Sequence, residues 1–404
     1  MAVVGLRGTG DWGTDERPKN FREMILWLSP NGDTPLFALM ARMKKETTDD
    51  PEYSWWEETL SIIRLQLNDG TGMLSTDTTF VVDNGTNGSD AQDLVPGDLL
   101  LVEEGAETAT YDYEIIKVTS ITSATTFVAT RGYAGTTATA ISDNTFLTKI
   151  GSVFEEGSVK ADATTRNPTK QSNFTEIFKT SYEITGTAKS TRARTGDALK
   201  NDKKRRMFDH SRDMEMAFIF GKKSEVTGSG GKPERTTSGI IKFMADAGQV
   251  VLRSGAYTAP EQFTDDVYSV FDYTTDGTTA GDERLALCGN GAMNTINKLA
   301  LGGGVINYDD TVKAWGMNLR TIRMPQGSLL LKTHPLLNRH LRYTNTVLVL
   351  DPPGIIYRPL VDRDTKPEDD IQTPGKDSKE GQWLTEAGIE VHHLQTMKMI
   401  TNIS

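Results

Sequence analysis

The chain has 404 residues, a net charge of −11 at pH 7 and a single cysteine, Cys288. A hydrophobic fraction of 37% with 25% charged residues excludes a disordered chain and is typical of a globular protein with two or three structural units. One cysteine excludes a disulfide framework and a cysteine metal site, and no apolar run of about 18 residues predicts a membrane span or a secretion signal. We therefore expect a soluble protein made in a cytoplasm.

The first 50 residues or so predict an arm followed by a helix. Glycine, threonine, aspartate and proline dominate the arm, and Asn31-Gly32-Asp33 predicts a turn. Thr34 caps a predicted helix that starts at Pro35 and continues through LFALMARMKKE, and Asp49-Asp50-Pro51 ends it.

Strand patterns then flank a segment of different composition. Residues 53–67 predict an outgoing strand with Trp55 and Trp56, and the pattern resumes after Gly157 in NFTEIFKTSYEITGT. Residues 68–150 are rich in Thr, Gly, Asp and Ala, nearly free of Lys and Arg, and divided into short runs by turn clusters. They predict a small inserted β-barrel or sandwich. The apolar residues of the return strand include Phe174, Ile177, Phe178 and Tyr182.

The longest uninterrupted helical pattern runs from Thr195 to Lys223. Thr195 or Asp197 is the expected N-cap, and Gly221 stands where a left-handed C-terminal residue is expected. One face is apolar, with Leu199, Met207, Met214, Ala217, Phe218 and Gly221, widened by Phe208 and Ile219.

The opposite face of this helix is basic. Its cations are Lys200, Lys203, Lys204, Arg205, Arg206 and Arg212. From Lys189 to Lys223 there are 11 basic and 5 acidic residues, a local charge of +6. This pattern indicates either a solvated helix face or a surface for nucleic acid or an acidic partner.

The C-terminal half predicts a mixed α/β region. A helix is expected over Phe263–Phe271 with Thr264 as its cap, then a buried strand over Leu285–Cys288 and a short helix that ends at Gly302–Gly304. The segments SLLLKT, TVLVL, GIIYRPLV and GIEVHHLQTMKMI predict further strands. Asp362–Glu380 predicts a charged Pro/Gly loop.

Residues suited to catalysis or metal binding do not form a recognisable set. The histidines, His210, His334, His340, His392 and His393, lack metal spacing, and the last two are expected on opposite faces of a strand. Cys288 predicts a buried thiol rather than a nucleophile, and Asp83–Asp90 lacks the acidic twelfth ligand of a calcium loop. We therefore predict no catalytic residue, no metal and no cofactor. Extended arms bury little surface within a monomer. They therefore predict a chain that becomes ordered through contacts with neighbouring subunits.

The return strand and the long helix carry a family resemblance. The residues are NFTEIFKTSYEITGTA from Asn173 to Ala188, the basic helix, and RTTSGI from Arg235 to Ile240. With the order of elements over nearly the whole chain, they resemble the major capsid (major head) proteins of tailed bacteriophages with the HK97 fold, in the branch of the SU10-type major head protein.

This resemblance implies an α+β fold with named parts. These are an N-terminal arm (1–52), E-loop strands (53–67 and 151–190), an inserted β domain on the E-loop (68–150), a P-domain with the spine helix (191–235), an A-domain (236–345) and C-terminal P-domain strands (346–404). It also implies homo-hexamers and homo-pentamers that form a virion shell around double-stranded DNA, assembled in a bacterial cytoplasm. Scaffolding, portal and decoration proteins, and the packaged DNA, are its implied partners; a membrane is not.

Two other classes of protein remain open at this point. One is another virion part, a tail or baseplate protein, which shares the Thr- and Gly-rich β composition. The other is a β-rich carbohydrate-binding protein or hydrolase, against which the lack of a signal peptide and of paired carboxylates counts. The long basic helix in mid-chain favours the shell protein.

Overall fold

The computed structural model describes residues 44–58, 63–83, 90–103, 113–160, 163, 168–191, 196–255, 257–273, 283–303, 308–314, 317–339 and 342–403. The chain divides into two compact units. Unit 1 comprises Met1–Trp55 and Gln171–Ser404, and unit 2 comprises Trp56–Lys170. Both strands and helices are present, so the predicted α+β class is confirmed.

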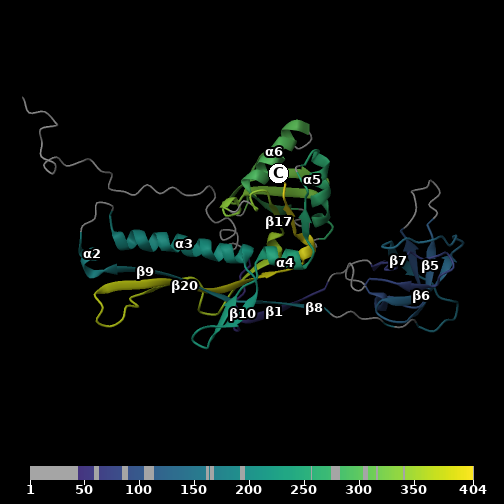
Figure 1. Cartoon of the computed structure of the whole chain (residues 1–404), viewed down its shortest axis with the longest axis horizontal. Helices are drawn as coiled ribbons and strands as arrows, with labels where there is room; N and C mark the ends of the chain where they lie inside the picture. Colours follow the sequence, from purple (N-terminus) through teal and green to yellow (C-terminus); the bar gives the residue numbers. More distant parts are fainter. Residues whose placement is uncertain are drawn as a thin grey trace, which may run out of the picture. The chain divides into compact units, whose positions relative to one another are not determined.

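Unit 1 contains a sheet built on one very long strand, β20 (Ser378–Val391). The ten residues of β9 (Glu176–Thr185) pair antiparallel with Ser378–Ala387 along one edge of β20. Two short strands, β19 (Lys366–Asp369) and β18 (Ile355–Pro359), share the other edge. Helix α3 (Ala198–Phe220) runs alongside β9 and β20 (Figure 1).

The second sheet of unit 1 has seven strands in the order β12-β21-β17-β13-β16-β15-β14. Their bounds are β12 Val250–Leu252, β13 Glu283–Cys288, β14 Tyr308–Ala314, β15 Met317–Met324, β16 Gly327–Thr333, β17 Val347–Leu350 and β21 Lys398–Thr401. Helices α4 (Ile240–Asp246), α5 (Pro260–Val267) and α6 (Asn290–Gly303) accompany this sheet, with short 3-10 turns at Tyr268–Phe271, Leu337–Arg339, Pro352–Gly354 and Leu394–Thr396. One apolar core packs α3 and α4 against both sheets, and a second packs α5 and α6 against the seven-stranded sheet.

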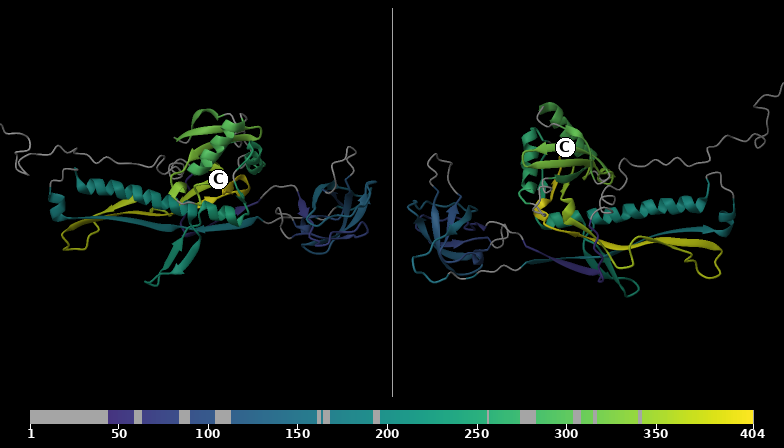
Figure 2. Two further views of the ribbon diagram at one scale, coloured as in Figure 1. Left: turned by 45° about the horizontal axis from the view of Figure 1, so that its top comes forward. Right: turned by 180° about the vertical axis from the view of Figure 1, so that it is seen from behind.

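Two ribbons and a short helix complete unit 1. Strands β1 (Glu52–Glu57) and β8 (Thr169–Phe174) pair with each other, and β10 (Ser224–Thr227) pairs with β11 (Pro233–Thr236). The β10–β11 hairpin leaves the body of unit 1 (Figure 2), and nearly all of its residues are exposed. Helix α2 (Gly186–Ser190) separates β9 from α3.

The ends of α3 partly differ from the prediction. Asp197 is the N-cap, since its Oδ1 accepts from the Lys200 amide at 3.2 Å, whereas Thr195 lies outside the described residues. Gly221 follows the helix but has a φ of −59°, so the predicted left-handed conformation is wrong. A Cβ at Gly221 would clash with Ala217 O and lie 2.5 Å from Thr237 O. Close approach of the backbone, rather than a positive φ, requires glycine here.

The apolar stripe predicted for α3 is also partly wrong. The helix buries Met214, Phe218 and Ile219 towards its C-terminal end, where α4 and both sheets meet it. Met207, in the N-terminal half, is 45% exposed. The buried set instead includes two polar residues, His210 and Glu215, each of which has a hydrogen-bond partner on another element.

Four further predictions for unit 1 need correction. The last residues of the predicted N-terminal helix, 44–46, are extended beside β18, and its preceding residues lie outside the described part of the chain. Helix α5 starts earlier than predicted because Pro260 begins it, so Thr264 lies inside the helix rather than at its cap. The stretch Asp362–Glu380 is not all loop, since it holds β19 and the start of β20. β20 ends at Val391, and His393 has a φ of 50°, so the two histidines do not alternate on a strand.

Unit 2 is a six-stranded antiparallel sheet in the order β2-β7-β4-β5-β6-β3. The bounds are β2 Arg64–Gln66, β3 Thr79–Val81, β4 Asp98–Val102, β5 Ile115–Ile121, β6 Thr126–Tyr133 and β7 Phe146–Ser152, with a 3-10 turn at Ala91–Asp93. The sheet encloses an apolar core of its own, in which Phe80 and Phe127 stack at 5.1 Å between ring centroids. Unit 2 has 17 acidic and 7 basic residues, so it holds −10 of the chain's net charge of −11.

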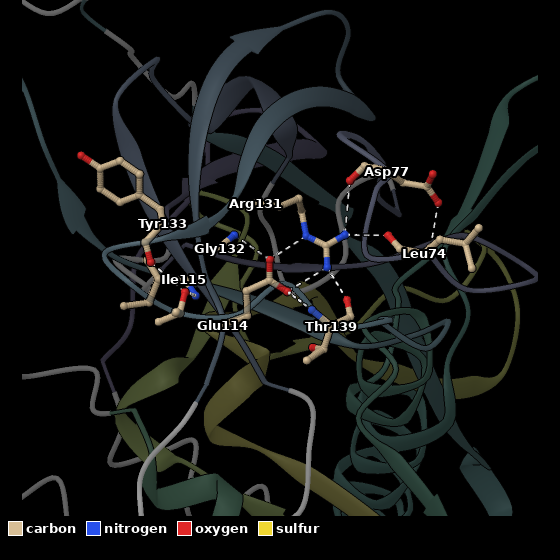
Figure 3. Close-up of polar contacts among 9 residues, drawn as sticks. Leu74, Asp77, Glu114, Ile115, Arg131, Gly132, Tyr133 and Thr139 are labelled. Carbon is tan, nitrogen blue, oxygen red and sulfur yellow. Dashed lines mark hydrogen bonds and ion pairs between the residues drawn. The ribbon is translucent and has the colours of Figure 1, made fainter.

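A buried ion pair fastens two loops to the sheet of unit 2 (Figure 3). The Arg131 guanidinium meets the Glu114 carboxylate in a fork, at 2.7 Å and 2.8 Å. The carboxylate also accepts from the amides of Gly132 and Thr139, at 3.0 Å and 3.1 Å. Arg131 in turn donates to the carbonyls of Leu74, Asp77 and Thr139, so it holds the loops on both sides.

This ion pair predicts acid sensitivity of unit 2. Burial alone would raise the pKa of Glu114, but Arg131 and the two amides outweigh it and lower the pKa below its usual 4.5. The pair therefore stabilises unit 2 fully above the unfolded pKa, and this stabilisation is lost as pH falls through the lower, folded pKa. We expect thermal unfolding followed from about pH 6 to pH 3 to show this loss, and Glu114→Gln to flatten it. An equally steep profile in Glu114→Gln would assign the acid sensitivity to other groups.

Candidate assembly surface

His210 connects α3 to both long strands of the sheet beneath it. The buried imidazole has Nδ1 at 3.1 Å from Thr180 Oγ1 on β9 and Nε2 at 2.8 Å from Thr385 Oγ1 on β20. Burial lowers the pKa of His210. The indole of Trp383 donates to Lys203 O at 3.2 Å, which adds a second link. These contacts hold α3 against the paired strands β9 and β20.

The six cations predicted on α3 do not form one free basic face. Lys203 pairs with Asp369 of β19 at 2.8 Å and lies over the rings of Tyr182 and Trp383. Asp369 was not predicted as a partner of Lys203, because it lies in Asp362–Glu380, which was predicted to be a loop.

The remaining cations of α3 divide into two groups. Arg206 and Arg212 both contact Asp209, at 3.7 Å and 3.1 Å, and Arg212 also contacts Asp213 at 3.4 Å, so their charge is balanced along the helix itself. Lys200, Lys204 and Arg205 are exposed and have no acidic partner within the described residues. These three are the cations that α3 presents outward.

The outgoing strand presents its two tryptophans to opposite sides. Trp55 is buried, stacks with Tyr53 at 6.3 Å and meets Phe243 of α4 at 6.0 Å. Trp56, next along the strand, is 65% exposed. Alternation along β1 explains the difference, because successive side chains of a strand face opposite ways. Only Trp56 is available for contact outside the subunit.

The return strands also alternate. Phe178 and Tyr182 are buried on the side of α3, where Phe178 meets Phe218 edge-on at 5.9 Å. Ile177 is 51% exposed, and Phe174 is partly covered by Lys223, whose Nζ lies 4.5 Å from the ring centroid. Of the return-strand set, Ile177 alone is an exposed apolar side chain.

Asn173 is the polar hub at the base of the return strand. Its Nδ2 donates to Ile389 O at 2.8 Å and to Thr237 Oγ1 at 3.1 Å, and its Oδ1 accepts from the Ser238 amide at 2.8 Å. The side chain is fully buried, so each of these bonds replaces one with water. Asn173 thus joins β8 to β20 and to the loop before α4.

The other titratable groups singled out in the sequence have structural roles. Cys288 is buried, and burial raises the pKa of its thiol to about 12, which makes it a poor nucleophile. Among the described residues no group of His, Cys, Asp and Glu is arranged to hold a metal ion. Residues 84–89 of the calcium-like stretch and His340 lie outside the described part of the chain.

No helix in the described residues is both long and apolar enough to cross a membrane.

The comparison with known proteins concerns the whole chain. The family described as SU10 major capsid protein matches residues 6–404. A curated relative, the major capsid protein of Pseudomonas phage PaMx41, is 24% identical over 361 residues, which cover 89% of this chain and 82% of the relative.

Solved capsid structures are also similar. The capsid of cyanophage A-1(L) has a TM-score of 0.48 and 8% identity, over 97% of this chain and 98% of that chain. The capsid of an empty GTA particle has a TM-score of 0.45 and 11% identity, over 96% of both chains. The family match extends over nearly every residue, and the chain therefore belongs to the SU10 major capsid protein family.

Proposed function

We propose that this major capsid protein self-assembles into hexamers and pentamers, which close into the icosahedral or prolate head of a tailed bacteriophage around double-stranded DNA. The family match over residues 6–404 carries the proposal and favours a shell protein over a tail, baseplate or carbohydrate-binding protein. Its role is structural rather than enzymatic. Scaffolding, portal and decoration proteins are the further partners that we propose.

The proposed fold is that of HK97-like capsid subunits. In it α3 is the spine helix and, with β18, β19 and β20, belongs to the P-domain, while β9, which pairs with β20, falls within the proposed E-loop strands. Five strands of the seven-stranded sheet, with α5 and α6, fall within the A-domain proposed for residues 236–345, and β17 and β21 join them from the proposed C-terminal strands. Residues 1–52 form the N-terminal arm, 53–67 and 151–190 the E-loop strands, 68–150 an inserted β domain, 191–235 the spine region and 346–404 the C-terminal strands. The separate core of unit 2 supports an inserted domain that folds as its own unit.

Negative-stain microscopy of the expressed full-length protein, with light scattering on the same sample, tests the assembly directly. Closed shells, or rings of five and six subunits, are the expected result. A monomer at every concentration, even in the presence of the gene products encoded beside it, would contradict the proposal.

Trp56 is expected to act as an anchor between subunits. It is a large exposed apolar side chain on a strand whose neighbour, Trp55, is locked into the core. Buried tryptophans are frequent hot spots of interfaces, so Trp56→Ala should raise the concentration needed for assembly about tenfold or more. The variant should keep the melting temperature of the unassembled protein, whereas Trp55→Ala should lower it by creating a cavity. Assembly of Trp56→Ala at the wild-type concentration would remove Trp56 from the interface.

The outward cations of α3 are proposed to make charge contacts in the shell or with packaged DNA. Lys200, Lys204 and Arg205 support this, since no described acidic group balances them, and the acidic unit 2 of another copy is one complementary surface. For Lys204→Glu/Arg205→Glu we expect impaired assembly at low salt if the contact is between subunits, and normal shells with weaker DNA retention if the contact is to DNA. Arg206→Gln/Arg212→Gln is the control, because Asp209 and Asp213 already balance those charges. Unchanged assembly and DNA retention would contradict this proposal and indicate that the three cations are only a solvated helix face.

A further inference from the structure

Residues 44–48, here called the N-terminal segment, add a short strand to the edge of β18. The amides of Glu46 and Thr48 donate to Tyr357 O and Pro359 O at 3.1 Å and 3.0 Å. The Val361 amide donates to Thr48 O at 2.9 Å. The Tyr357 amide also donates to Lys44 O at 3.3 Å, and the pairing is parallel with two isolated bridges.

Arg358 of β18 pairs with the side chain of Glu46 in the N-terminal segment. Its Nη1 lies 3.0 Å from Glu46 Oε2, and its Nε donates to Glu390 Oε2 on β20. Its guanidinium also lies 5.9 Å from the centre of the Tyr53 ring on β1. The Arg358 side chain is only 17% exposed, so these contacts are partly shielded from water.

Glu390 links Arg358 to β1 through His392, which stacks on Trp55. Its side chain is 3% exposed, and its second oxygen, Oε1, bonds His392 Nε2. The His392 ring stacks on Trp55 at 6.0 Å between centroids and 26° between planes. Burial alone would raise the pKa of Glu390, but His392 and Arg358 lower it, as expected for a carboxylate held between two donors.

The backbone beside this cluster leaves little room for β1 to adjust. The Tyr53 hydroxyl donates to Ile389 O at 2.7 Å, directly above Gly388. A Cβ at Gly388 would clash with that hydroxyl and lie 2.6 Å from Phe174 O. Tyr53 and Trp55 therefore have one well-defined seat, and Arg358, which contacts Glu46, lies over the Tyr53 ring beside it.

We propose that Arg358 couples the N-terminal segment to β1: when Glu46 leaves Arg358, the Glu390–His392 contact that seats Trp55 loosens, and strand β1 becomes mobile with it. A planar guanidinium suits this role because it bonds two carboxylates in fixed directions at once. Coupling of this kind is a free energy shared by two sites, and it acts in both directions. In a shell subunit it would make rearrangement of the N-terminal segment and of the strand bearing Trp56 a single event. The coupling itself is a property of one chain and does not depend on assembly.

Hydrogen exchange of the full-length protein, read by mass spectrometry, tests the coupling. Glu46→Gln keeps the shape of Glu46 but removes its charge from Arg358. We expect about fivefold or faster exchange in peptides covering 44–50 and also in those covering 52–57. Arg358→Lys retains the positive charge but lacks the fork, so it should accelerate both peptides similarly, and adding Glu46→Gln should cause little further change.

Lys45→Ala is the matched control. Lys45 belongs to the same segment but pairs with Asp364, whose carboxylate otherwise accepts from the Tyr357 hydroxyl and the Thr365 amide. This variant should accelerate exchange in 44–50 and leave 52–57 unchanged. The coupling would be overturned if Glu46→Gln loosened only 44–50, or if Lys45→Ala loosened 52–57 to the same extent. Thermal unfolding of each variant confirms that the comparison is made between folded proteins.

Discussion

Arg131→Met is expected to destabilise unit 2 by about 3–5 kcal/mol, because it leaves the buried Glu114 carboxylate without its counter-charge. The Glu114 side chain is 1% exposed and would keep only the amides of Gly132 and Thr139. The loops that carry Leu74, Asp77 and Thr139 would also lose the donor that holds their carbonyls. A domain of this size has a stability of about 5–15 kcal/mol, so a large part of it would be lost.

Calorimetry of the full-length protein, with hydrogen exchange in β5 and β6 to assign the transition, measures the effect. Unit 2 has its own core, so its transition should shift down by more than about 10 °C. Arg64→Met is the control within the same sheet. Arg64 bonds Glu103 at 3.0 Å with both side chains partly exposed, and such pairs contribute about 1 kcal/mol or less. Equal losses in the two variants would show that burial of the Arg131 pair adds nothing.

Local elements could be predicted from the sequence where a capping residue or a regular apolar pattern decides the secondary structure. The helix α3 has an Asp197 cap, no proline and a long helical pattern, and the observed helix begins after Asp197, one of the two expected caps, and ends before Gly221. The alternating runs of residues 68–150 correspond to β3, β4, β5 and β6. A buried apolar strand and a glycine-terminated helix were likewise found at β13 and α6.

Other features depend on partners that are distant in the sequence. β19 was missed because it contains Pro367 and charged residues, a composition that a strand tolerates only at the edge of a sheet, where β19 lies. The pairing of Glu176 with Ala387 joins residues more than 200 positions apart, and no local pattern fixes that register. The conformation of Gly221 is decided by Thr237 O on a different element.

The residue types of the candidate assembly surface could be predicted from the sequence. Whether each side chain is paired, buried or exposed could not. Lys203 was expected on an open basic face, and the structure pairs it with Asp369. The alternation of Trp55 and Trp56 was implicit in the strand pattern, but which of them faces inward depends on the stacking of His392. Buried polar residues such as Glu215 were placed on a helix without any indication that they would need a partner.

His334→Leu is expected to cost about 3–5 kcal/mol of the stability of unit 1, because it removes the partner of a second buried carboxylate. His334 Nε2 lies 2.6 Å from Glu215 Oε1 on α3, and both side chains are fully buried. The Leu336 amide donates to His334 Nδ1 at 3.2 Å, so Nδ1 carries no proton and Nε2 is the nitrogen that donates to Glu215. The His334 amide bonds Cys288 O at 2.8 Å, so this one residue ties α3 to β13.

His334→Gln separates the two contacts of the imidazole. A glutamine amide retains an N–H donor for Glu215, but its oxygen then no longer lies where Nδ1 accepts from the Leu336 amide, so its cost should be about 1–2 kcal/mol. Thermal unfolding of the unassembled protein measures both variants, and hydrogen exchange in α3 and β13 locates the loss. If His334→Leu were as stable as His334→Gln, the buried hydrogen bond between His334 and Glu215 would not be what joins the helix to the sheet. If both lost stability in the expected order, the joint between α3 and β13 would rest on the donor to Glu215.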